Sequence, residues 1–124
     1  MEVYKAAPVG HEVSYVFYEV PEKFLTDGES MKEILVEGLK HFDFTIVGEP
    51  CMKIFPNGSY TMIIILSESH LAVHTYKEHN SLYIGMYSCR GPHDCDEMMM
   101  YFAYSVYAEE ILRTTDSPIP VKKR

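Results

Sequence analysis

The chain of 124 residues lacks a long hydrophobic run and a cysteine framework. Its longest uninterrupted apolar stretch, Met62 to Leu66, is far too short to span a bilayer, so no membrane partner is expected. The N-terminal MEVYKAAPVGHEVSY has no basic segment followed by an apolar one, so no secretory signal is expected. Cys51, Cys89 and Cys95 form no CxxC pair, which is typical of reduced thiols. We therefore expect one cytoplasmic domain spanning residues 1–124.

Basic residues are also sparse. The chain has eleven Lys and Arg and eighteen Asp and Glu, which gives a formal net charge of −7. Apart from the KKR tail the basic residues are scattered, whereas phosphate binding needs a concentrated basic face. This composition argues against a nucleic-acid partner and mildly favours a small cationic ligand.

The hydrophobic pattern predicts an α+β fold. Strands are expected over 12–20, 60–66, 71–76 and 81–89, with a bent strand over 44–55 before a Pro56-Asn57-Gly58 hairpin turn. Helices are expected over 30–42, with Ser30 and Glu33 as a capping box, and from Asp94 or Asp96 to about Arg113, followed by an extended tail. This order predicts a two-layer sandwich, an antiparallel sheet with helices packed on one face. The strand 60–66 is apolar at successive positions, so we expect it to lie centrally in the sheet or to be covered on both sides.

A polar cluster, LSESHLAVHTYKEH, follows the apolar TMIIIL run over residues 66–79. On a strand, His70 and His74 lie about 13 Å apart and cannot share one ion, so no metal site is expected. Ser69 and His74 suggest a hydrolase, but the chain has no GxSxG elbow. Taken singly, these residues favour a solvated loop over an active site.

Taken together, they resemble the prokaryotic S-adenosylmethionine decarboxylases, which make a pyruvoyl cofactor from an internal serine. The family signature ESHLxxHTWPE corresponds to ESHLAVHTYKE here, and its TCG segment corresponds to SCRG. The separation of Ser69 from Cys89 (89 − 69 = 20) also matches the family. Upstream, KIFPNGSYT resembles the HKFxPxGxS segment, so the resemblance covers most of the chain.

The resemblance implies self-cleavage between Glu68 and Ser69. Residues 1–68 would become the beta chain, and residues 69–124 an alpha chain that begins with a pyruvoyl group formed from Ser69. His74 would have the acid/base role in processing, a role suited to the near-neutral pKa of histidine. Thr61 falls where the family usually places an assisting serine, and Cys89 matches the general acid of turnover.

The same resemblance implies that Phe55 lies near the sulfonium of S-adenosylmethionine and that Glu78 binds its ribose hydroxyls. The product would be the aminopropyl donor of spermidine synthesis, and the family's dimers imply a homodimer. Tyr76-Lys77 in place of Trp-Pro, Arg90 after Cys89, and Gly85 in place of an acid depart from the pattern. These departures keep arginine or ornithine decarboxylation on the same fold open as an alternative. A catalytically inactive homologue or an unrelated small-molecule binding domain is a further alternative.

Overall fold

The computed structural model describes residues 8–67, 69–90 and 95–123. Along the chain its elements are β1 (Val9–Tyr18), α1 (Glu22–Thr26), α2 (Gly28–His41), β2 (Cys51–Ile54), β3 (Tyr60–Leu66), β4 (Ser69–Tyr76), the 3-10 helix η1 (Lys77–His79), β5 (Ser81–Ser88), α3 (Asp96–Ser105) and β6 (Glu110–Pro120).

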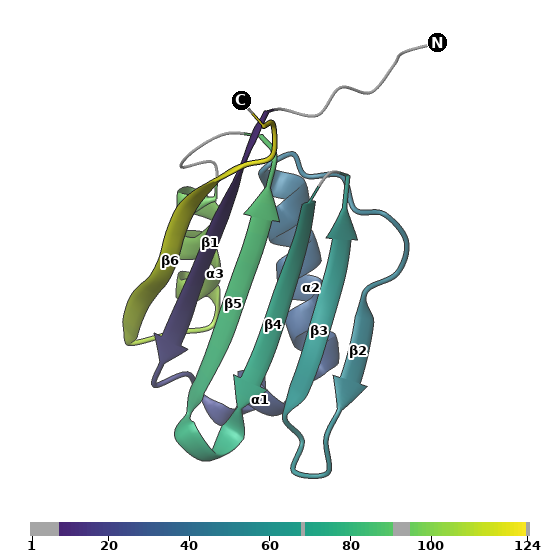
Figure 1. The fold of residues 1–124 in the computed structure, drawn as a ribbon. Helices are drawn as coiled ribbons and strands as arrows, with labels where there is room; N and C mark the ends of the chain where they lie inside the picture. The colour runs from purple at the N-terminus through teal and green to yellow at the C-terminus, as the bar shows by residue number, and fades with distance from the viewer. Residues whose placement is uncertain (1–7, 68, 91–94, 124) are drawn as a thin grey trace.

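Within these residues the strands form one sheet in the order β2-β3-β4-β5-β1-β6, and neighbouring strands are antiparallel. Helices α2 and α3 lie together behind the sheet in Figure 1, and no described helix covers the front. The predicted α+β sandwich, with helices on one face of an antiparallel sheet, is confirmed.

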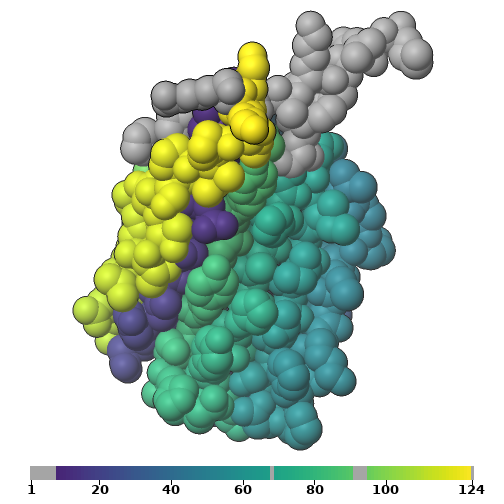
Figure 2. Space-filling view, viewed as in Figure 1, coloured from purple at the N-terminus to yellow at the C-terminus, as the bar shows by residue number. Residues whose placement is uncertain are grey.

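The hydrophobic core lies between the sheet and this helical layer. In β4, Leu71 and Val73 are buried toward the helices, whereas His74 and Tyr76 point to the opposite, open face. The same alternation in β3 leaves Ile65 58% exposed. A place inside the sheet, one of the two alternatives for this strand, is confirmed, since β3 lies between β2 and β4. The other alternative, a cover on both sides, is wrong, because the described helices form a layer on one face only. Figure 2 shows the open face as a broad surface built from strands.

Helix α2 begins at Gly28, two residues before the predicted start. The Asp27 carboxylate caps it by accepting hydrogen bonds from the Ser30 backbone N–H (3.1 Å) and the Ser30 hydroxyl (2.7 Å). These bonds lower the pKa of Asp27. The predicted capping box was wrong: Ser30 is the partner of the cap and not the cap itself. The short helix α1 was not predicted.

The last predicted helix was too long. Helix α3 ends at Ser105, the chain turns through Tyr107 at a φ of 56°, and β6 then pairs along the whole of β1. Ile111 and Leu112 continue a helical spacing in the sequence, but their backbones pair with β1, so they form part of the strand β6. The extended tail is confirmed. Asp94, one of the two predicted caps, lies outside the described residues.

The predicted hairpin turn joins β2 to β3, with Gly58 at a φ of +95°. The bent strand before it is reduced to β2 and an isolated bridge between Ile46 and Leu66. No helix in the described ranges has the length and apolar character needed to cross a membrane.

Candidate active site

Ser69 is the first residue of β4 and pairs with Leu66, the last residue of β3. Its hydroxyl oxygen is buried and has no hydrogen-bond partner among the described residues. A buried hydroxyl normally finds a partner, so an unpartnered one marks a position shaped for something other than stability. Glu68, the other half of the predicted cleavage site, lies outside the described residues.

Cys89 lies at the same end of the sheet as Ser69. His70 pairs with Tyr87 across β4 and β5, so the antiparallel register places the residues just after β5 beside the start of β4. Cys89 is a free, half-buried thiol. The structure therefore brings together two of the three predicted catalytic residues at one end of the sheet.

The Tyr87 side chain adds a hydroxyl to this end of the sheet that the sequence did not single out. A hydrogen bond with the Cys89 side chain, and to a lesser extent burial, raises the pKa of Tyr87. The Tyr87 ring stacks on His70 with a centroid distance of 6.2 Å. A Cβ atom at Gly10 would lie 2.0 Å from the Tyr87 hydroxyl, so any other residue there would displace this ring from its present position. His70, which the motif left without a role, thus supports the tyrosine beside Cys89.

Thr61 and His74 form a second group, nearer the opposite end of the same sheet. They are directly opposed in the β3–β4 pair, and the Thr61 hydroxyl lies 3.0 Å from His74 Nδ1 in a hydrogen bond. The His74 ring also packs against Tyr83 on β5, with centroids 5.7 Å apart. The two residues expected to act together in processing are therefore in direct contact.

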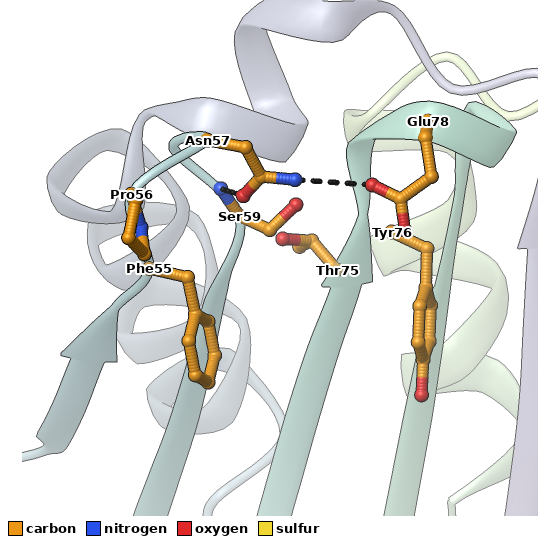
Figure 3. A pocket seen from close by; sticks show the side chains of 7 residues that line it. All are labelled: Phe55, Pro56, Asn57, Ser59, Thr75, Tyr76 and Glu78. Carbon is orange, nitrogen blue, oxygen red and sulfur yellow. Dashed lines mark hydrogen bonds between the residues drawn. The ribbon is translucent and has the colours of Figure 1, made fainter.

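Phe55 and Glu78 line a pocket of about 440 Å³ beyond this pair, where the β2–β3 turn meets η1 (Figure 3). The Asn57 side-chain amide donates a hydrogen bond of 3.0 Å to Glu78 Oε2. The rings of Phe55 and Tyr76 lie on opposite sides of the pocket, and the two residues are 42% and 44% exposed. Aromatic faces and a carboxylate suit a cationic ligand that also carries hydroxyl groups.

Asn57 and Tyr76 are pocket residues to which the sequence gave no binding role. Asn57 was assigned only to the hairpin turn, and Tyr76 was noted only as a departure from Trp. The available signal was their adjacency in sequence to Phe55 and Glu78.

The predicted site residues thus fall into two groups that one copy of the chain keeps apart. Ser69 and His74 are five positions apart on one straight strand (74 − 69 = 5), which is about 16 Å. Neither side chain can reach the other, since a hydrogen bond spans only about 3 Å. One copy alone therefore does not bring His74 to Ser69.

With this geometry in place, comparison with known proteins decides the family. The family model described as S-adenosylmethionine decarboxylase matches residues 11–115. The chain belongs to this family. The match includes both groups of predicted site residues.

Several relatives bear the name S-adenosylmethionine decarboxylase proenzyme. The one from Symbiobacterium thermophilum is 35% identical over 80 residues, which cover 64% of this chain and 60% of the relative. The one from Sulfurisphaera tokodaii is 30% identical over 101 residues, covering 82% of this chain and 81% of the relative. The crystal structure of the adenosylmethionine decarboxylase from Aquifex aeolicus superposes with a TM-score of 0.76 at 20% identity. The superposition covers 93% of this chain and 92% of the Aquifex aeolicus chain. At 20% identity, this similarity shows that the two proteins share a fold.

Proposed function

We propose that this chain is a self-processing S-adenosylmethionine decarboxylase that cleaves its own backbone between Glu68 and Ser69. The observation that supports it most directly is the buried, unpartnered Ser69 hydroxyl at the start of β4, with Cys89 at the same end of the sheet. The name proenzyme, given to the relatives in the family, agrees with a chain that must be processed.

Processing needs a hydroxyl that is free to attack the preceding carbonyl. The Ser69 oxygen adds to the Glu68 carbonyl carbon, and the C–N bond between the two residues breaks to leave an ester. Loss of the Ser69 α-proton then expels residues 1–68 as a carboxylate. The dehydroalanine that remains takes up water and releases ammonia, leaving a pyruvoyl terminus. An Oγ without a competing hydrogen bond fits the first step, so the residues present fit this cofactor.

The pyruvoyl group would supply an electron sink when the substrate loses carbon dioxide. The chain's own residues bind the substrate and deliver a proton. The half-buried Cys89 thiol donates the proton to the former α-carbon, and the Tyr87 hydroxyl can stabilise the thiolate that is left. In the pocket, the Phe55 ring faces the sulfonium and Glu78 accepts hydrogen bonds from the ribose hydroxyls.

Because the two groups lie about 16 Å apart in one copy, the complete site requires a second copy. Two open sheet faces packed about a two-fold axis, with their strands antiparallel, would bring the His74 end of β4 in one copy next to the Ser69 end of β4 in the other. The exposed Ile65 and Tyr76 side chains give this face the apolar surface that such an interface buries. The homodimer is thus part of the proposed function. The free thiols of Cys51 and Cys89 agree with action in the cytoplasm.

One mass spectrum of the purified protein tests the processing. The expected result is two chains, residues 1–68 and residues 69–124 with a blocked amino terminus that reacts with a carbonyl reagent. Ser69→Ala should give one intact chain and no labelling. A wild-type chain that stays intact and unlabelled under all conditions would refute the proposal.

The substrate is tested by carbon dioxide release from S-adenosylmethionine, arginine and ornithine side by side. The expected result is release from S-adenosylmethionine, because Phe55 and Glu78 share one pocket. Release from arginine or ornithine alone would instead favour the other decarboxylases of this fold. Cys89→Ala should slow turnover more than cleavage, and an unchanged turnover rate would count against its role as the acid.

A further inference from the structure

Arg90 follows Cys89 directly, and its side chain is anchored to another part of the chain. One guanidinium nitrogen, Nη1, donates a hydrogen bond of 3.0 Å to the backbone carbonyl of Asp43. The guanidinium carbon lies 4.0 Å from the centroid of the Phe44 ring, a close cation–π contact. Arg90 also holds its own loop, since its backbone N–H donates to the Ser88 hydroxyl at 3.2 Å. Arg90 therefore connects the segment that carries Cys89 to the corner formed by residues 43–47.

This corner is itself fixed to the end of α2. Asp43 has a left-handed φ of 63° and its N–H donates to the Lys40 carbonyl at 3.1 Å. The Phe44 N–H donates to the Leu39 carbonyl at 2.8 Å, and the Phe44 side chain is buried in the core. The guanidinium of Arg90 is therefore held by backbone that is hydrogen-bonded to the end of α2 and by a buried ring.

The same corner is bonded to the strand end that leads to Ser69. The Ser67 N–H donates to the Thr45 carbonyl at 3.0 Å, and the Val47 N–H donates to the Ile65 carbonyl at 2.8 Å. Ser67 precedes Ser69 by two residues. One corner thus holds the backbone before Ser69 directly and the backbone after Cys89 through Arg90.

We propose that Arg90 is a positioning residue for proton delivery: it ties the segment 88–90, which carries Cys89, to the corner at residues 43–47 and so fixes the thiol relative to the terminus formed at Ser69. Arginine suits this task because a planar guanidinium can donate along its edge to a carbonyl while its face lies on a ring. Lysine keeps the charge but has a point ammonium that cannot do both in the same geometry.

The proposal rests on the proposed function, because the proton that Cys89 delivers belongs to the decarboxylation. Its first test is independent of that function. In the uncleavable Ser69→Ala chain, with Cys51→Ser to remove the exposed thiol, Cys89 alkylation by iodoacetamide is followed by peptide mass spectrometry. Arg90→Ala should free the loop and raise the alkylation rate several-fold, and Arg90→Lys should give a smaller rise. Lys32→Ala, which removes a cation paired with Glu29 on α2, should leave the rate unchanged.

The second test separates positioning from mere stability in the processed enzyme. Arg90→Ala should lower kcat by roughly ten- to a hundred-fold, since a misplacement of about 1 Å suffices for such losses. KM and the rate of self-cleavage should stay within about two-fold of wild type, because neither uses the thiol. Arg90→Lys should recover part of kcat.

The outcomes are distinct. If Cys89 in Arg90→Ala is alkylated at the wild-type rate, Arg90 does not hold the segment that carries Cys89, and the proposal is overturned. If cleavage and kcat fall together with the unfolding midpoint, Arg90 is only structural, which also overturns it. Should Arg90→Ala fail to fold, Arg90→Lys carries the same two tests, and a wild-type alkylation rate together with a wild-type kcat in that variant overturns the proposal. If wild type neither cleaves itself nor releases carbon dioxide, the proposed function fails. Faster Cys89 alkylation when Arg90→Ala is added to the Ser69→Ala chain would still support the anchoring of Cys89 by Arg90.

Discussion

Two inactive variants are expected to restore activity when they share one dimer. Ser69→Ala removes the proposed cofactor precursor, and His74→Ala removes the proposed processing base. In one copy the two positions are about 16 Å apart on β4, so in the proposed homodimer His74 acts on the Ser69 of the other copy. A mixed dimer then contains one complete site, made of Ser69 from one chain and His74 from the other, and one site that lacks both.

The size of the effect follows from this arrangement. With equal amounts and random pairing, about half of the dimers are mixed, and each mixed dimer has one working site out of two. Activity should therefore reach about a quarter of the wild-type value, and about half of the His74→Ala chains should be cleaved.

The assay is co-expression with two different affinity tags, because self-cleavage follows folding. Tandem purification isolates the mixed dimers, and mass spectrometry identifies which chain is cut. Cleavage should occur only in the His74→Ala chain. As a control, each variant expressed alone should stay intact. If isolated mixed dimers show no cleavage, or if His74→Ala is cleaved without its partner, the shared site is refuted.

Three further changes test the pocket and its surroundings. Thr75→Val removes a buried hydroxyl that donates to the Leu25 carbonyl and accepts from the Tyr60 N–H, both at 2.9 Å, and should cost roughly 2–4 kcal/mol in urea unfolding. Thr75→Ser keeps both bonds, so equal stability of the two variants would contradict this account. Asn57→Asp keeps the turn acceptor for Ser59 but loses the donor to Glu78, so KM for S-adenosylmethionine should rise by about two- to ten-fold, and an unchanged KM would speak against the contact. Burial raises the pKa of Tyr60, so above about pH 10 the unfolded chain binds fewer protons than the folded one and stability falls as pH rises. The free energy of unfolding should fall less steeply above this pH in Tyr60→Phe than in wild type, and equal slopes would contradict the assignment.

Local patterns in the sequence were sufficient for much of the fold. The alternation in 71–76, the helical spacing after residue 30 and the Pro56-Asn57-Gly58 turn each reflect a geometry that neighbouring residues impose on the backbone. The prediction failed where backbone pairing decided the structure. Ile111 and Leu112 fit a helix by spacing, yet the free edge of β1 takes them into β6.

For the site, the sequence determined which chemical groups are present and how they are spaced along the chain. The family motif contains Ser69, His74 and Cys89 at fixed separations, and this is a property of the chain alone. Membership of the family follows from it.

Only the tertiary structure decided which of these groups lie together. Antiparallel pairing puts Cys89, twenty residues away in sequence, at the same end as Ser69 (89 − 69 = 20), while a straight strand keeps His74 away from Ser69 although only five residues separate them (74 − 69 = 5). The contact of Arg90 with Asp43 and Phe44 likewise could not be predicted from the sequence. The physical reason is common to these cases. The direction of each strand and its pairing with its neighbours determine which residues lie close together in space. Neither the direction nor the pairing can be read from a single residue.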